Sequence, residues 1–248
     1  MEVTDVHAHH GSLRWTPTRK SSIQNMIEML NTFNIGRCFV SSIEAIVYDI
    51  HSGNREMMED IKIDNRLKGY VTINANYVEE SKAVVEKYIT KHGFVGVKIH
   101  QIGSGQPIDS PNTLEILTVV SKLRVPILVH TYGKGGIEDP AHVLNVVDHY
   151  PNLPIILAHM GGDNWRGGIE VAAKKDSLYV DPCSCTQPHA DKIKEAVNQL
   201  GAQRILFGTD MPLIHPSWGL GMIESADITP REREMILSEN ARQIWPSL

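Results

Sequence analysis

Apolar runs of strand length recur along this chain about every 30 residues, the usual length of one strand-plus-helix unit. The candidate strands begin near Glu2, Gly36, Lys68, Phe94, Val125, Leu153, Ser177 and Arg204. The stretches between them repeat apolar residues at the 3–4 spacing of an amphipathic helix, as in Ile23, Met26, Ile27, Leu30 and Phe33. Runs such as Pro154–Ala158 are apolar throughout, which is typical of parallel strands covered on both faces.

Eight alternating units in 248 residues predict a single (β/α)8 TIM barrel, with residues 1–248 as one domain. An open, doubly wound sheet is the structural alternative. It is disfavoured because no Gly-x-Gly-x-x-Gly follows the first run. In addition, only a closed barrel would bring the first, fifth, sixth and eighth runs to a common centre.

Those four runs carry ionisable residues at or near their ends. The first contains Asp5, His7 and His9 at alternate positions, and the later three end in His130, His159 and Asp210. Alternation along a strand places Asp5, His7 and His9 on one face, and it aligns Leu128 with His130, Leu157 with His159 and Gly208 with Asp210. Two imidazoles roughly 7 Å apart at Cα can bind one ion. The carboxyl ends of barrel strands form the active site, so the pattern predicts a metal centre there.

The combined pattern resembles the amidohydrolase superfamily. Ala158-His159-Met160-Gly161-Gly162, Leu206-Phe207-Gly208-Thr209-Asp210-Met211-Pro212 and Asn240-Ala241-Arg242 are similar to its amidohydrolase-related branch, the metal-dependent hydrolases of the TIM-barrel fold. The resemblance covers essentially the whole chain. It implies one divalent metal ion held by His7, His9, His130 and Asp210, with His159 acting on water or substrate.

Chemical roles follow from this assignment. Neutral imidazoles and a carboxylate favour Zn²⁺, with Mn²⁺ or Fe²⁺ as alternatives. Asp210 is expected to accept a proton from water and pass it to the leaving group, and His159 to stabilise an oxyanion or carry the proton. Asp5 is expected to orient an imidazole from behind.

The fourth run, Phe94–His100, leaves the number of metal ions open. Lys98 and His100 share the inward face with Gly96. Some members of the superfamily carry a carboxylated lysine on strand four that bridges two metal ions, and others bind one ion without it. One ion and an unmodified Lys98 are favoured here, because the strand-end ligands suffice for one four-coordinate site. His100 is then expected to line the substrate pocket.

Other polar residues have weaker functional readings. Arg14, Lys134 and Arg166 could hold a substrate carboxylate, although solvated surface charge is the alternative for each. Cys183 and Cys185 are interpreted as buried small side chains, with a pocket-lining role second. Surface positions are expected for His215, which could also reach the pocket, and for His10, His51, His92, His142, His149 and His189.

Composition argues against a nucleic-acid-binding or membrane-spanning protein. A net charge of −5 gives no basic footprint for nucleic acid, and no apolar run approaches the ~20 residues of a membrane span. The strand-like Met1-Glu2-Val3 predicts no signal peptide, and three cysteines suggest reduced thiols, so a cytoplasmic protein is expected. The expected partner is a small-molecule substrate, and homo-oligomerisation stays open.

The leading interpretation is a metal-dependent hydrolase that cleaves a C–N or C–O bond in a small amide, cyclic amide or lactone. The alternative is a metal-dependent decarboxylase of a small carboxylic acid, because the same branch contains enzymes resembling aminocarboxymuconate-semialdehyde decarboxylase. A non-enzymatic ligand-binding barrel is a third reading. It is disfavoured because a binding module has no need of an open metal position beside a proton acceptor.

Overall fold

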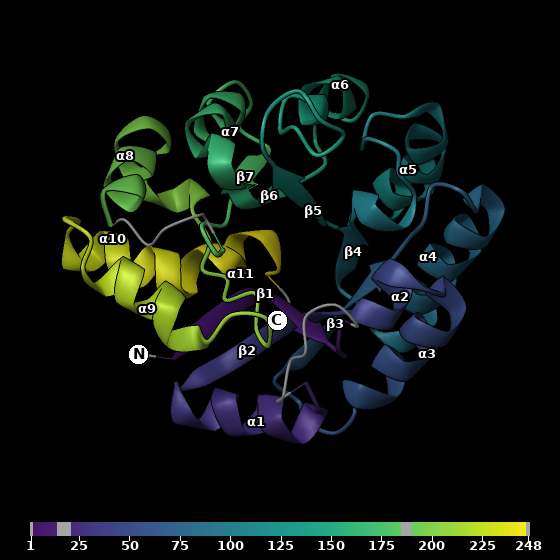
Figure 1. Cartoon of the computed structure of the whole chain (residues 1–248), viewed down its shortest axis with the longest axis horizontal. Helices are drawn as coiled ribbons and strands as arrows, with labels where there is room; N and C mark the ends of the chain where they lie inside the picture. Colours follow the sequence, from purple (N-terminus) through teal and green to yellow (C-terminus); the bar gives the residue numbers. More distant parts are fainter. Residues whose placement is uncertain (1, 14–20, 185–189, 247–248) are drawn as a thin grey trace.

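The computed structural model describes residues 2–13, 21–184 and 190–246. Within them, a curled parallel sheet lies at the centre and helices surround it (Figure 1). The strands follow chain order across the sheet: β1 Val3–His10, β2 Ile35–Ser42, β3 Leu67–Thr72, β4 Gly96–Ile99, β5 Ile127–Tyr132, β6 Ile155–Gly161 and β7 Leu178–Val180. The α/β class and the parallel sheet are confirmed.

The helices lie in the stretches between the strands and after the last of them. They are α1 Ile23–Thr32, α2 Ile43–Val47, α3 Ile50–Asp60, α4 Val78–His92, α5 Pro111–Leu123, α6 His142–His149, α7 Trp165–Ala172, α8 Ala190–Leu200, α9 Pro216–Glu224, α10 Pro230–Glu234 and α11 Asn240–Ile244. A π-helical turn, Met235–Glu239, joins the last two. Thr229 caps α10 in a capping box with Glu232, and Pro230 occupies the first turn. No helix in the described ranges has the length and apolar character to cross a membrane.

Residues 205–211 replace the eighth predicted strand without forming a regular one. The segment lies between β7 and β1: the Leu206 amide donates to the Val180 carbonyl (2.9 Å), and the Val6 amide donates to the Phe207 carbonyl (2.9 Å). Only the isolated bridges Val180–Ile205 and Ala8–Met211 are formed. Asp210 adopts a left-handed φ of 61°, which interrupts the extended conformation that a strand requires. A regular strand beginning at Arg204 was therefore a wrong prediction for the described residues.

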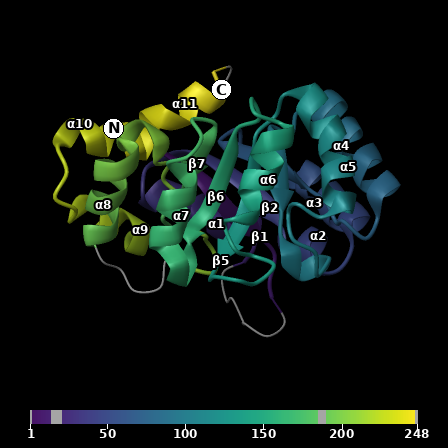
Figure 2. The ribbon, with the colours of Figure 1, turned by 90° about the horizontal axis from the view of Figure 1, so that it is seen from above.

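Two apolar clusters hold the sheet in place. The larger fills the space between the sheet and the helices, and the smaller contains inward-facing strand residues such as Val6, Phe39 and Leu128. Trp245, just after α11, closes the smaller cluster: its ring lies 4.2 Å from that of Phe39, and its Nε1 donates to the Val95 carbonyl just before β4 (2.9 Å). The chain's last helices therefore cover the end where the strands begin (Figure 2), and the opposite end is left for the functional loops.

Candidate active site

β1 brings two histidines to the inner side of the sheet. The Nε2 atoms of His7 and His9 lie 3.2 Å apart, and both side chains are buried. A bulge makes this possible: residues 5–8 of β1 face only residues 38–40 of β2. The bulge breaks the alternation, so Val6 belongs to the inner cluster while Asp5 lies beside Cys38 of the outer one.

Asp5 consequently does not orient an imidazole, and that prediction was wrong. Its carboxylate accepts hydrogen bonds from the Thr209 hydroxyl (2.6 Å), the Thr209 amide (3.1 Å) and the His7 amide (3.0 Å). Burial raises the pKa of Asp5 to about 7. Asp5 ties the 205–211 segment to β1 and so helps to place Asp210.

Asp210 completes a compact group with the two histidines of β1. Its Oδ1 lies 3.1 Å from His9 Nε2 and 3.7 Å from His7 Nε2. Metal–nitrogen bonds of 2.0–2.1 Å in a tetrahedral site separate neighbouring ligand atoms by about 3.3 Å. The three observed separations are close to that value. Two imidazoles and a carboxylate therefore fit a divalent transition metal in both spacing and chemistry.

The outer nitrogens of both imidazoles are held by other residues. His7 Nδ1 donates to Asp181 Oδ2 (2.8 Å), and Ser41 Oγ lies 2.9 Å from His9 Nδ1. These contacts turn each Nε2 towards Asp210, as in the carboxylate–histidine–metal arrangement. Asp181, which follows β7, was not singled out from the sequence, although it too is an ionisable residue closing an apolar run.

Replacing Asp181 with asparagine is expected to weaken metal binding by about 10–100-fold, because the His7 ring loses the carboxylate that fixes its orientation. A competition titration with a chromogenic chelator measures this affinity. Asp176→Asn is the matched control, since Asp176 precedes the same strand and its side chain is fully exposed. Equal metal affinity in Asp181→Asn and Asp176→Asn would contradict the orienting role.

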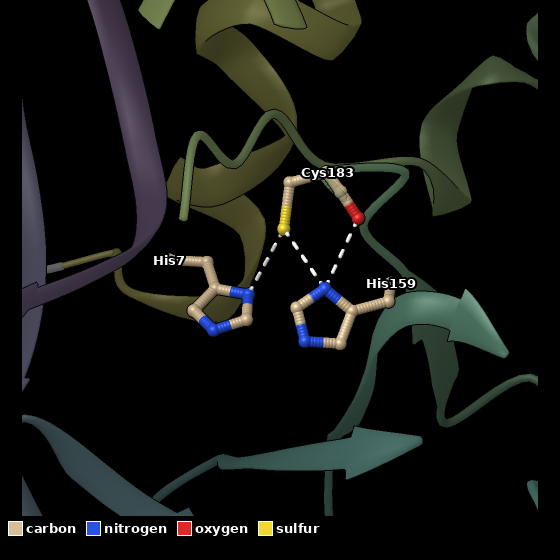
Figure 3. Close-up of side chains that lie close together, drawn as sticks. All are labelled: His7, His159 and Cys183. Carbon is tan, nitrogen blue, oxygen red and sulfur yellow. Dashed lines mark hydrogen bonds between the residues drawn. The ribbon is translucent and has the colours of Figure 1, made fainter. Parts of the chain in front are cut away.

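His159 lies beside His7, with ring centroids 4.9 Å apart. Its Nδ1 lies 3.1 Å from the Cys183 carbonyl oxygen, and Cys183 Sγ lies 3.1 Å from His7 Nδ1 and 3.5 Å from His159 Nδ1 (Figure 3). Its Nε2 lies 3.1 Å from His130 Nδ1. His159 has a φ of 61°, a left-handed conformation that is strained for a non-glycine residue.

That conformation corrects the expected alignment of Leu157 with His159. Leu157 packs in the outer cluster and Ala158 in the inner one, so an uninterrupted strand would turn His159 outward. The positive φ turns the imidazole back towards the centre. Burial lowers the pKa of His159 to about 4, which keeps the ring neutral near pH 7.

His130 stands apart from the compact group. It is not among the side chains that gather with His7, His9 and Asp210. Its ring stacks on His100, with centroids 4.0 Å apart and planes within 10°, and its Nε2 lies 3.4 Å from Glu138 Oε2. Of the four proposed ligands, three therefore converge, and the fourth lies beside His159.

Lys98 is fully buried and its Nζ lies 2.9 Å from His7 Nε2. The ammonium thus contacts the atom that would bind the metal. Burial lowers the pKa of Lys98 to about 8, while Asp210 partly opposes the shift. In Asp210, burial favours the neutral acid, but the hydrogen bond with His9 and the nearby imidazoles of His159 and His7 outweigh it and lower the pKa. Asp210 is therefore a carboxylate at neutral pH.

A pocket of about 360 Å³ opens over these residues. Its lining includes the apolar residues Leu13, Ile43, Ile46, Val47, Ile102 and Leu213. It also includes the ring and carboxylate side chains His9, His100, His130, Tyr132, Glu138, His159 and Asp210. Glu138 was not considered from the sequence because it lies in a loop without periodicity. The space suits a small molecule with one apolar face.

The remaining candidates lie elsewhere. Arg166 pairs with Glu195 (3.1 Å) and covers the Trp165 ring, and Lys134 is exposed; neither lines the pocket. Arg14, Cys185 and His189 lie outside the described residues. His215 is exposed and caps α9. The surface position expected for His10 is wrong, because this residue is buried against Asp60 at the end of β1.

Comparison with known proteins identifies the family of the chain. The family model described as amidohydrolase matches residues 4–246. No curated protein matches the chain. Among solved structures, the chain resembles 2,6-dihydroxybenzoate decarboxylase from Rhizobium, with 17% identity, a TM-score of 0.79, and coverage of 99% of this chain and 98% of the other.

Two further structures have the same fold. Dihydroxybenzoic acid decarboxylase from Polaromonas, with bound manganese and 2-nitroresorcinol, shows 16% identity, a TM-score of 0.78, and coverage of 99% and 97%. A probable 2-pyrone-4,6-dicarboxylic acid hydrolase from Acinetobacter baumannii, with citric acid bound, shows 18% identity, a TM-score of 0.77, and coverage of 99% and 100%. These identities establish a shared fold, whereas the family match spans nearly the whole sequence. The chain therefore belongs to the amidohydrolase family.

Proposed function

We propose that this protein is a metal-dependent hydrolase that cleaves a C–N or C–O bond in a small molecule such as an amide, a cyclic amide or a lactone. The observation that carries the proposal is the convergence of His7 Nε2, His9 Nε2 and Asp210 Oδ1 at separations of 3.1–3.7 Å. These three residues are the proposed ligands of one divalent ion, Zn²⁺ or Mn²⁺. His130 is the candidate for the fourth ligand.

When bound, such an ion supplies a nucleophilic water at neutral pH and polarises the substrate carbonyl. Asp210 is ionised and buried beside the attacking position, so it accepts the proton of the water and returns it to the leaving group. His159 is neutral and lines the same pocket, and its Nδ1–H donates to the Cys183 carbonyl oxygen. Its Nε2 is therefore a proton acceptor, so the ring can carry a proton during the reaction. The apolar lining residues exclude water from the rest of the substrate.

The pocket wall favours hydrolysis of a neutral group. Among its described lining residues there is no arginine or lysine to pair with a substrate carboxylate, and Glu138 would repel one. Decarboxylation is the second candidate, and Lys98 favours it. This buried cation, 2.9 Å from His7 Nε2, could pair with a carboxylate bound at the centre. Two of the similar structures are decarboxylases of hydroxybenzoates.

A substrate panel separates the two reactions. The metal-loaded protein is incubated with aryl esters, lactones and anilides, and in parallel with hydroxybenzoates. Mass spectrometry in H₂¹⁸O detects water uptake, and released CO₂ is trapped. Hydrolysis is supported if ¹⁸O enters the product with the wild type and does not enter it with His159→Asn. CO₂ release without isotope uptake would replace hydrolysis by decarboxylation.

We also infer that residues 205–211, although not a regular strand, occupy the place of the eighth strand and close the barrel, and that the chain forms one domain. The support is the pair of backbone hydrogen bonds that join this segment to β7 and β1. Gly208 is required in the segment because a Cβ there would meet Asp181 Oδ1 at 2.6 Å and His7 Cβ at 2.9 Å.

Lys98 is expected to be unmodified, and the group of His7, His9 and Asp210 beside it is expected to bind a single metal ion. The ligands converge without an added carbamate, and an ammonium about 4 Å from a divalent ion costs roughly 8 kcal/mol at an effective dielectric of 20, so Lys98 must swing away or pair with an anion. Intact-mass and peptide mass spectrometry under non-acidic conditions measure the modification. An added carboxyl group on the peptide that contains Lys98 would overturn the single-ion centre.

A further inference from the structure

A second group of metal-binding side chains lies behind the carboxyl end of β1. His10 ends this strand and faces Asp60, the last residue of α3. The His10 Nδ1 and Asp60 Oδ2 atoms form a buried ion pair at 2.7 Å, and neither atom has a hydrogen-bond partner of good geometry among the described residues. Glu56 lies one helical turn before Asp60, and a ligand atom from each of the three residues falls within 4.8 Å of the others.

The carboxylates around this group outnumber the basic side chains, so a bound cation would be favourable. Asp60 places a carboxylate at the carboxyl end of a helix, where the partial negative charge of the helix dipole makes an anion unfavourable. Glu44, Glu56 and Glu59 line the groove beside it, and Arg55 is the one basic residue among its described lining. The His10 side chain is nine-tenths buried, so solvent cannot readily satisfy its ring nitrogen.

We propose that His10, Asp60 and Glu56 form a second, peripheral site for a divalent transition metal such as Zn²⁺ or Mn²⁺. One imidazole and two carboxylates suit these ions, and exposed Glu56 can move to complete the site. His10 and His9 leave opposite faces of β1, so this ion is separate from the catalytic centre. It clamps the end of the strand that carries His7 and His9 to α3.

Counting the metal ions bound by the wild type and by single and double variants tests the proposal. The full chain is equilibrated with Zn²⁺, freed of loosely held ion by gel filtration and measured by elemental analysis. The wild type is expected to hold two ions, His10→Ala one, Asp210→Asn one, and the double variant none. His142→Ala is the matched control, because His142 also pairs with a carboxylate, Asp109 at 3.0 Å, but joins no group of three ligands among the described residues.

The count separates the two metal proposals. If Asp210→Asn loses no ion while His10→Ala loses one, the proposed catalytic centre fails and the peripheral site stands. If His10→Ala and Asp60→Asn both hold as many ions as the wild type, the peripheral site is overturned.

Thermal unfolding distinguishes a metal site from a simple ion pair. In the Asp210→Asn background, added Zn²⁺ is expected to raise the Tm in a concentration-dependent manner, and His10→Ala to remove that rise. An equal loss of Tm from His10→Ala in Zn²⁺ and in chelator would show an ion pair only and overturn the proposal.

Discussion

Asp210→Asn is expected to abolish catalysis and empty the proposed centre while the chain stays folded. The substitution removes the carboxylate that lies 3.1 Å from His9 Nε2 and 3.7 Å from His7 Nε2, and with it the proton acceptor of the reaction. Loss of several kcal/mol of transition-state stabilisation corresponds to about 10³-fold or more in rate. The fold is preserved because the backbone amide of Asp210 still donates to the His7 carbonyl (2.8 Å).

Metal content is measured by elemental analysis of Asp210→Asn in the His10→Ala background, which lacks the proposed peripheral ion. Circular dichroism reports the fold, and turnover of the substrate found in the panel reports catalysis. Asp148→Asn is the control, since Asp148 pairs with Lys175 on the surface, far along the chain from the proposed ligands. Full metal content and activity in Asp210→Asn would exclude Asp210 from the centre.

His159→Asn is expected to lower kcat by at least about 10²-fold, the lower range for loss of a general acid–base group, with the metal retained. The amide can still reach the Cys183 carbonyl, which His159 Nδ1 contacts at 3.1 Å, so local structure should survive. The neutral imidazole that faces the substrate is lost. Rapid-quench kinetics and metal content are measured on the same preparation.

His149→Asn, at the exposed end of α6, controls for the loss of an imidazole as such. Loss of the metal in His159→Asn would place His159 among the ligands and would favour a two-metal centre. A normal kcat with the metal present would remove His159 from the mechanism.

The local sequence was sufficient to predict the α/β class and the parallel sheet, and it named most of the residues of the candidate site. The apolar runs and the 3–4 spacing between them predicted each of the seven strands to within two residues of where it starts, because burial on both faces leaves a periodic signature in the chain itself. The parallel arrangement then places all strand ends at one edge. His7, His9, His159 and Asp210 could therefore be proposed together before any coordinates. In the structure, His7, His9 and Asp210 form one group, and the His159 ring lies 4.9 Å from that of His7.

Backbone irregularities and long-range pairing were decided only by the tertiary structure. The bulge in β1 turned Asp5 away from the imidazoles, and the left-handed conformation of His159 reversed its direction. Neither has a local signal, because each is held by contacts with residues far away in the chain. The same holds for Asp181, 174 residues from His7, and for Asp60, 50 residues from His10. Periodicity reports which face of an element is buried, whereas the identity of the partner across that face depends on how the sheet curls and closes.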